Sequence, residues 1–365
     1  GRKAKGQWAA ESGPINMRAP IHGGPARADL LNKYLRKSSG CFGCPFQCNG
    51  WYDVPGIGQG SAMCGQWWYG VFDRDDAKAV WEGNMLTQKL GINNWYTLGL
   101  MQFLRETIPT GIVKPEELGI PVPEWIGGKA TRHEFITALL NGIAEGTSPL
   151  AAGMGRAAEQ LNEEAFKIYE DVFAARGYKG HCNGWIGASL LWAIDTRDPI
   201  NSGHDFQAFG NPSPEAKKIA EYFGVPGGME TTVIGNPDQA IYEGIEHQAR
   251  WVYLAQCIKN SLPMCEFASK PSDFFDPPEM DLKKFHCQLL STVAGLDISP
   301  EELDKKGEAI SNMMRSIMVM REDRSREKDT LTDSFFEKGH FDLNAWAMAG
   351  PINREKFEAL KSRFY

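Results

Sequence analysis

Apolar residues recur at helical spacing along most of this chain, and stretches that alternate with a period of two are few. Asp75 and Asp76 open one apolar stretch that stops at Gly91, and negative charge in a first turn is typical of a helix N-terminus. Thr131 and Glu134 form a capping box before a second helical stretch. Further amphipathic helices are predicted over residues 154–175, 214–223, 237–258, 281–293 and 300–321. The pattern therefore predicts a mainly α fold.

Segments rich in proline and glycine separate these helices. Two such joints cover residues 109–128 and 223–237, and a glycine-rich segment lies at 177–187. We take the glycine-rich segment as the boundary between two helical domains, residues 1–178 and 179–365.

Composition narrows the class of protein. With 365 residues, 42% of them hydrophobic, the chain can bury a sizeable core. Its longest apolar runs, such as residues 187–194, are shorter than the roughly 20 residues of a membrane span. A net charge of −7 argues against nucleic acid as the main partner. The chain begins with Gly1, and no signal-peptide core is visible near it, so we expect a piece of a longer, cytoplasmic protein.

Three of the 8 cysteines lie close together, at the spacing C-x2-C-x3-C: Cys41, Cys44 and Cys48. Zinc sites usually pair two C-x2-C knuckles, and no second knuckle is present. A [4Fe-4S] cluster takes four thiolates, three of which can come from one loop while the fourth comes from far away. The order also differs from the C-x3-C-x2-C of radical enzymes that use S-adenosylmethionine. An iron-sulfur cluster is therefore favoured over three buried structural thiols, which would invite oxidation.

Cys257 and Cys287 fall inside helical patterns, where a free cysteine usually behaves as a small core residue. Cys265 differs because it follows Pro263, just beyond a predicted helix end, where its side chain can be presented to a cluster.

The stretch IKNSLPMCEF, which contains Cys265, resembles the D-x-x-G-L-C segment of the tungsten-containing aldehyde ferredoxin oxidoreductase family. QKLGIN, at residues 88–93, resembles the companion D-x-x-G-L-D motif of that family. EGTSPLAAGMGRAAEQL, MREDRSREKDTLTDSFFE and INREKFEALKSRFY are similar to further family segments, so the resemblance covers nearly the whole chain. It implies the two helical domains of this family, without the β-rich domain that precedes them.

The resemblance also implies cofactors and ligands. Family members hold tungsten or molybdenum between two pterins, beside a [4Fe-4S] cluster, and a Mg ion is a further expectation. The cluster ligands would be Cys41, Cys44, Cys48 and Cys265. The pterin-contacting residues would be Gln88, Gly91, Asn93, Asn260, Ser261 and Met264. The first domain would thus carry the cysteine loop and one pterin motif, and the second domain the other motif and the fourth cysteine.

Three family aspartates are replaced here, by Gln88, Asn93 and Asn260, and a family glycine is replaced by Pro263. An amide oxygen can still accept a hydrogen bond from a pterin N–H group, although without a full charge. The alternative is that these residues only end helices and contact no ligand.

The segment LLWAIDTRDPINSGHDF resembles a family segment that carries an active-site histidine, which would be His204 here. Histidine suits proton transfer near neutral pH. Asp195, Arg197 and Asp198 could orient it or line a substrate entrance. The alternative for His204 is an ordinary surface or capping residue.

Typical family members carry acidic residues near the metal, yet this chain has no Glu between Cys48 and Glu82. It has Cys64 there, after a glycine-rich approach that would let the backbone come close to a bulky cofactor. We hypothesise that Cys64 coordinates the tungsten or lies within its reach, against the alternative of a core cysteine. This departure resembles the catalytic subunit of tungsten-dependent benzoyl-CoA reductases.

Three classes of function follow. The first is an oxidoreductase that oxidises aldehydes to carboxylic acids and passes electrons to ferredoxin or to a partner iron-sulfur subunit. The second keeps the cofactors but reduces an aromatic acyl-CoA. The third is a non-enzymatic iron-sulfur or zinc protein. A homodimer is a further expectation from the family.

Overall fold

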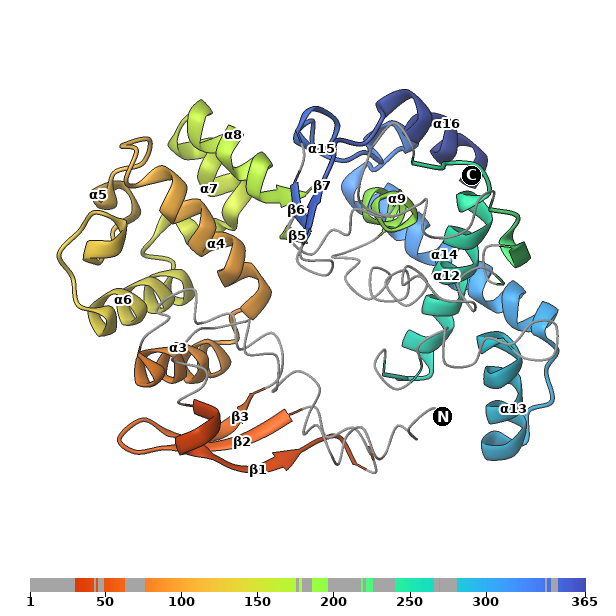
Figure 1. The fold of residues 1–365 in the computed structure, drawn as a ribbon, viewed down its shortest axis with the longest axis horizontal. Coiled ribbons are helices and arrows are strands. Elements are labelled where there is room, and N and C mark those ends of the chain that lie inside the picture. The colour runs from red at the N-terminus through yellow and green to blue at the C-terminus, as the bar shows by residue number, and fades with distance from the viewer. Residues whose placement is uncertain are drawn as a thin grey trace. The chain divides into compact units, whose positions relative to one another are not determined.

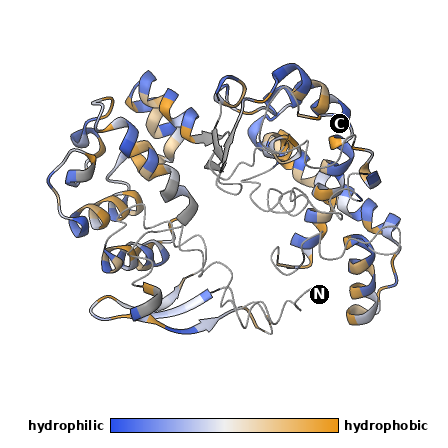
Figure 2. Ribbon diagram, viewed as in Figure 1, coloured by the Kyte–Doolittle hydropathy of each residue, from blue (hydrophilic) through white to orange (hydrophobic). Residues whose placement is uncertain are grey.

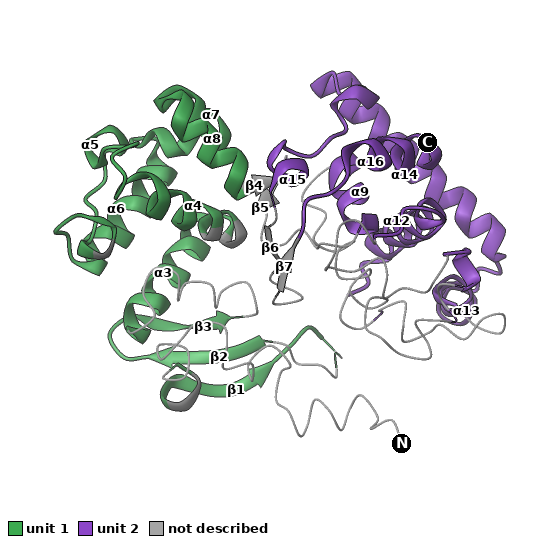
Figure 3. Ribbon diagram, turned by 45° about the horizontal axis from the view of Figure 1, so that its top comes forward, with its two compact units in different colours: residues 1–172 green, residues 173–365 purple. Residues whose placement is uncertain are grey.

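The chain divides into two compact units in its computed structural model, residues 1–172 (unit 1) and 173–365 (unit 2) (Figures 1 and 3). The boundary lies a few residues before the one taken from the glycine-rich segment. The structure describes residues 30–42, 44, 49–62, 76–174, 177–178, 186–195, 218, 221–225, 240–265, 269, 281–338, 340–342 and 347–365. The predicted mainly α class is confirmed.

Unit 1 begins with a small antiparallel sheet in the order β1-β2-β3, which follows the π-helical turn η2 (Leu30–Tyr34). Its strands are β1 (Leu35–Ser39), β2 (Asn49–Val54) and β3 (Gly58–Ala62). Buried residues alternate along β2, so that Tyr52 faces the interior and Trp51 does not. Gly56, at φ 85°, supplies the left-handed turn between β2 and β3.

The helices of unit 1 use the predicted caps. Asp76 accepts hydrogen bonds from the main-chain nitrogens of Lys78 (2.9 Å) and Ala79 (3.2 Å), and this starts α3 (Ala77–Leu90). Thr131 and Glu134 form the predicted capping box of α6 (Arg132–Glu145). The other helices of the unit are α4 (Asn94–Thr107), α5 (Pro115–Leu118), η4 (Glu124–Ile126), η5 (Pro149–Ala152), α7 (Met154–Leu161) and α8 (Glu163–Val172).

The single helix predicted over residues 154–175 is wrong, because the structure divides it at Asn162 into α7 and α8. Asn162 leaves the helical conformation and accepts a hydrogen bond from the main-chain nitrogen of Ala165 (2.8 Å), which caps α8. Its Nδ2 donates to the carbonyl oxygen of Ile112 (2.9 Å), on a distant loop. The tertiary contact therefore outweighs the continuous apolar period.

Unit 2 is built around α9 (Ile186–Ile194), whose nine residues are all buried and which is mostly apolar in Figure 2. Helices α12 (Ile245–Ser261) and α16 (Arg354–Phe364) pack against it and share its hydrophobic cluster, which includes Trp192 and Phe357. The unit also contains α13 (Leu282–Ala294), α14 (Pro300–Glu322), η10 (Arg326–Lys328), α15 (Ser334–Glu337) and two short hairpins, β4 (Phe173–Ala174) with β5 (Gly177–Tyr178) and β6 (His340–Asp342) with β7 (Ala347–Ala349).

The predicted helices of unit 2 agree with the structure to within a few residues, except at the start of α12. The pattern began at residue 237, but the helix begins after Gly244, which has φ 79°. The helix predicted at 214–223 lies mostly outside the described residues. Of the helices that the structure describes, none combines the length and apolar character needed to cross a membrane.

Candidate functional site

The predicted cluster loop is the connection between β1 and β2. Ser39 pairs with Asn49 across the two strands, so the sheet holds both ends of this loop together. The main-chain nitrogen of Cys44 donates to the carbonyl oxygen of Cys41 (3.0 Å), which forms a tight turn between them. Both thiols are free; Cys41 is exposed and Cys44 is partly buried. A short loop with accessible thiols suits ligation of a cluster, and Cys48 lies outside the described residues.

The base of this loop is packed tightly. At Gly50, a side-chain Cβ would come within 2.6 Å of the Tyr52 hydroxyl oxygen and 2.8 Å of Leu35 Cδ1. Tyr52 in turn contacts Trp81 of α3, and Trp81 Nε1 donates to the carbonyl oxygen of Gly58 (3.0 Å). The sheet that holds the cysteine loop is thereby joined to α3, the helix that carries the first pterin motif.

Helix α3 ends at that motif. Gly91 caps the helix at φ 69°, and its main-chain nitrogen donates to the carbonyl oxygen of Gln88 (3.3 Å). Gln88 is exposed, and its Nε2 donates to the carbonyl oxygen of Ser61 and to Asn84 Oδ1, both at 3.3 Å. These two bonds fix the orientation of the amide, so that its oxygen Oε1 is the atom left to accept. Asn93 is also exposed, two residues beyond the helix end.

Asn84 was not singled out from the sequence. Its side chain is 1% exposed, and its Nδ2 has no hydrogen-bond partner among the described residues. A buried donor without a partner costs about 1–3 kcal/mol, so such atoms usually contact a ligand or water. Its spacing of four residues from Gln88 was the only signal in the sequence, and asparagine inside a helix is too common to carry a prediction.

The second pterin motif lies at the end of α12. Asn260 and Ser261 are exposed in its last turn; Ser261 Oγ donates to the carbonyl oxygen of Cys257 (2.9 Å). Asn260 Oδ1 accepts from Gln256 Nε2 (3.4 Å). The main-chain nitrogen of Met264 donates to the carbonyl oxygen of Lys259 (2.9 Å), and this bond closes the turn that leads to Cys265.

Pro263 and Cys265 complete this turn. Pro263, which replaces the family glycine, has φ 24°, on the positive side that favours glycine. Cys265 is exposed and free, as a cluster ligand requires. That Cys265 joins Cys41 and Cys44 around one cluster stays a prediction.

The remaining cysteines differ in burial. Cys257 is buried as predicted, and burial raises the pKa of its thiol to about 12, so the thiol is protonated at neutral pH. Cys287, which was expected in the core, is only partly buried. No group of three or more Cys, His, Asp or Glu side chains within the described residues could hold a metal ion.

The predicted catalytic residues His204 and Cys64 lie outside the described residues, as do Arg197 and Asp198. The structure does describe Asp195, directly after α9, with 8% of its surface exposed. Its carbonyl oxygen is bound by Arg324, from a segment 129 residues away, and sequence reasoning missed this arginine.

Comparisons with known proteins show what this chain is similar to. A sequence model described as aldehyde ferredoxin oxidoreductase, domains 2 and 3, matches residues 16–365. A tungsten-containing aldehyde ferredoxin oxidoreductase from Pyrococcus furiosus is 24% identical over 362 residues, which cover 91% of this chain and 53% of the relative. Among solved structures, the active site complex BamBC of benzoyl coenzyme A reductase with 1,5-dienoyl-CoA matches with a TM-score of 0.57 at 15% identity. That match covers 92% of this chain and 54% of the solved chain, so this chain spans about half the length of both proteins.

Proposed function

Because the chain belongs to the aldehyde ferredoxin oxidoreductase family, whose domains 2 and 3 match residues 16–365, we propose that it forms part of an enzyme that oxidises aldehydes to carboxylic acids. The enzyme would bind a tungsten or molybdenum bis-pterin and one [4Fe-4S] cluster, and would pass electrons to ferredoxin or to a partner iron-sulfur subunit. A cytoplasmic location, a bound Mg ion and a homodimer belong to the same proposal.

The observation that carries the proposal is the fixed amide of Gln88. Its Nε2 is held by Ser61 and Asn84, so Oε1 remains to accept from a pterin N–H group, the role that a family aspartate would have. The buried Nδ2 of Asn84 adds a donor close to the same place. Donor and acceptor together fit a heterocycle that offers both kinds of group, and in this respect the residues present fit a pterin.

The other residues have separate tasks. Cys41, Cys44, Cys48 and Cys265 would hold the cluster, while Asn93, Asn260, Ser261 and Met264 would contact the pterins together with the Gly91 backbone. The bound metal group supplies the two-electron redox chemistry. When an aldehyde and water are converted to a carboxylic acid, two protons and two electrons are released; His204 would take up and release one of these protons, since its ordinary pKa lies near neutral pH.

A second candidate is reduction of an aromatic acyl-CoA with the same cofactors. The observation in its favour is Cys64, which stands in a stretch without glutamate where typical family members are acidic. The solved BamBC structure is a complex of benzoyl coenzyme A reductase with 1,5-dienoyl-CoA, but a likeness at 15% identity supports the fold alone. Assays of the full-length protein with aldehydes and with benzoyl-CoA separate the two reactions.

Elemental analysis of the anaerobically purified full-length protein tests the proposal. We expect about four iron atoms and one tungsten or molybdenum atom per chain. Cys265→Ser should lower the iron content and bleach the cluster absorption, whereas Cys287→Ser, at a partly buried helical cysteine, should leave both unchanged. Zinc alone would contradict both enzymatic candidates and support the non-enzymatic protein. Full iron content in Cys265→Ser would remove Cys265 from the ligand set.

A further inference from the structure

A basic stretch leads into the predicted cluster loop. The chain carries a net charge of −7, yet it has no Asp or Glu between Asp29 and Asp53, while this stretch contains Lys33, Arg36 and Lys37. All three cations are exposed, in the turn η2 and the strand β1. A local excess of positive charge on a protein that is acidic overall favours contact with an acidic partner.

The outer face of the sheet presents two of these cations beside an aromatic ring. Lys37 pairs with Trp51 across β1 and β2, and residues paired in an antiparallel sheet point to the same face. Tyr52, the next residue, points to the opposite face, where it contacts Trp81 of α3. Figures 1 and 3 show β1 as the strand farthest from α3. Lys37 and the exposed Trp51 are therefore open to another protein.

One carboxylate offsets part of this charge. Asp53 Oδ2 lies 3.6 Å from Arg36 Nε, and the Asp53 carbonyl oxygen accepts from Arg36 Nη2 at 3.5 Å. Both contacts are long and exposed to water, so they contribute little. Lys37 makes no ion pair with any residue that the structure describes. Helix α3 and its cap contain two lysines and two carboxylates and add no net charge. Positive charge is thus in excess over η2 and the three strands, with three cations and one carboxylate.

The cysteine loop itself presents an aromatic ring. Phe42 directly follows Cys41, and its side chain is fully exposed. The turn closed by the main chain of Cys44 and Cys41 holds the backbone on both sides of Phe42. The Lys37 Cα lies within about 14 Å of the Cys41 Cα, because four residues of extended chain span no more than that. Protein interfaces combine aromatic anchors with charges around them, and the charges speed up the encounter.

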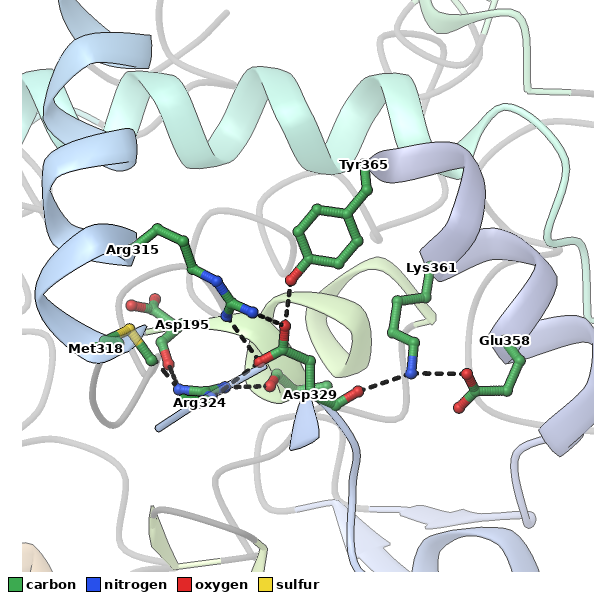
Figure 4. Close-up of polar contacts among 9 residues, drawn as sticks. Asp195, Arg315, Met318, Arg324, Asp329, Glu358, Lys361 and Tyr365 are labelled. Atoms are coloured by element: carbon green, nitrogen blue, oxygen red, sulfur yellow. Dashed lines mark hydrogen bonds and ion pairs between the residues drawn. The ribbon is translucent and has the colours of Figure 1, made fainter. Parts of the chain in front are cut away.

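The buried charges of unit 2, by contrast, are matched within the chain. Asp329, whose side chain has no exposed surface, accepts hydrogen bonds from Arg315 Nη1 (2.9 Å) and the Tyr365 hydroxyl (Figure 4). Arg324 Nε lies 2.9 Å from the same carboxylate, and Arg324 Nη1 donates to the carbonyl oxygen of Asp195 (2.6 Å). These groups serve the packing of unit 2, whereas the cations beside the cysteine loop can meet a partner.

We call the cations and rings beside the predicted cluster loop the carrier surface: Arg36, Lys37, Phe42 and Trp51. We propose that the carrier surface docks an acidic iron-sulfur protein, the electron acceptor of the enzyme. The inference rests on the proposed function, because it takes Cys41 and Cys44 as cluster ligands. Conversion of an aldehyde and water to a carboxylic acid releases two electrons and two protons. Two oxidised carriers dock in turn, and each accepts one electron from the reduced cluster.

The test uses the full-length, cofactor-loaded enzyme and, as the probe, a small acidic ferredoxin in its oxidised form. Lys37→Glu reverses one charge of the carrier surface, and Phe42→Ala removes the ring on the loop. The matched control is Lys129→Glu, which makes the same charge change at an exposed lysine before α6. Calorimetry measures the dissociation constant of ferredoxin. Aldehyde-dependent reduction of benzyl viologen, a dye too small to need the carrier surface, reports whether the cofactors are intact.

For Lys37→Glu we expect about tenfold weaker ferredoxin binding at about 20 mM salt and less than about threefold weaker binding at about 300 mM, because salt screens exposed charges. Phe42→Ala should weaken binding by about tenfold at both salt concentrations, since the burial of an apolar ring is not screened. Lys129→Glu should bind ferredoxin as the parent does. If Lys37→Glu lowers the iron content, Lys37→Gln takes its place in the comparison.

Equal ferredoxin affinity in the parent, Lys37→Glu and Phe42→Ala would overturn the inference, whether the carrier docks elsewhere or another part of the full-length protein covers the surface. An equal loss of affinity in Lys129→Glu would overturn it too, since net charge alone would then explain the effect. The proposed function fails separately. A full-length protein without iron, tungsten and molybdenum would contradict the enzyme, while weaker ferredoxin binding in Lys37→Glu and Phe42→Ala would still demonstrate the docking surface.

Discussion

The ring of Tyr52 lies against the ring of Trp81, with centroids 5.1 Å apart and planes inclined at 48°. Both side chains are almost completely buried. Tyr52 belongs to the strand that follows the cysteine loop, and Trp81 to the helix that ends at Gln88. The predicted cluster loop and the first predicted pterin motif are therefore both attached to the buried Tyr52–Trp81 contact, which we call the hydrophobic base.

Trp81→Leu should weaken this base. We expect a loss of about 3 kcal/mol in the free energy of unfolding, as for other large-to-small core changes. Iron content should fall as well, because the sheet that holds the cysteine loop loses its support. Trp81→Phe keeps a ring but loses the hydrogen bond to Gly58, and should cost about 1 kcal/mol from that bond.

Urea denaturation of the full-length protein measures the two losses in free energy of unfolding, and iron analysis measures the iron content. The control is Trp51→Phe, which changes the neighbour of Tyr52 in β2, a residue that is 37% exposed. If Trp81→Leu kept its iron while losing stability, the link between the hydrophobic base and the cysteine loop would be wrong.

His286 makes unit 2 sensitive to acid. Its side chain has no exposed surface, and burial, with a smaller contribution from Lys259, lowers its pKa from 6.5 to about 4. The unfolded chain therefore binds a proton between about pH 6.5 and 4 that the folded chain does not. The free energy of unfolding has its full value above pH 6.5 and decreases by up to about 3 kcal/mol as the pH falls to 4.

His286→Phe should remove this part of the pH dependence. Neither ring nitrogen of His286 has a hydrogen-bond partner among the described residues, so an apolar ring should also raise the melting temperature at neutral pH. Thermal unfolding between pH 4 and 8 measures both effects. His247→Gln, at an exposed histidine, serves as the control and should follow the parent curve. If the stability of His286→Phe decreased between pH 6.5 and 4 as much as that of the parent, another group would be responsible for this pH dependence.

Gln88→Leu should reduce the pterin content of the purified protein, because it removes the fixed acceptor Oε1 and both bonds of Nε2. Lys89→Leu changes the next residue, which is also exposed, and should leave pterin content unchanged. Fluorescence of the oxidised, released pterin measures the content directly. Equal content in both variants would remove Gln88 from the cofactor site.

Local signals in the sequence predicted the helices well. Asp76, Thr131 with Glu134, and Gly91 mark helix ends by hydrogen bonds or backbone angles that involve only near neighbours, so the sequence contains the whole signal. The break at Asn162 could not be predicted in the same way. It depends on the carbonyl oxygen of Ile112, and the apolar period continues across it.

In the candidate site, too, some residues could be predicted from local sequence signals, while others depend on contacts with distant residues. Cys41 and Cys44 were predicted from the spacing of the cysteines, and Gln88 and Cys265 from the resemblance of their segments to family motifs; all four stay predictions. Arg324 gave no such signal: the arginine and its acceptor, Asp195, are 129 residues apart, and many arginines follow helices without capping another helix. Asn84 was missed because its role depends on burial and on an unsatisfied donor.

The hydrophobic cluster of unit 2 joins α9 to Phe357 and Leu360 of α16, near the end of the chain. During translation, the contacts within unit 1 can form as soon as residue 172 has left the ribosome. Helix α9 can pack against α12 once residue 261 has been made, but its contacts with α16 form only after residue 364 has been made, so part of its apolar surface stays uncovered until then. A chaperone that recognises exposed apolar segments would therefore bind α9 while unit 2 is being made.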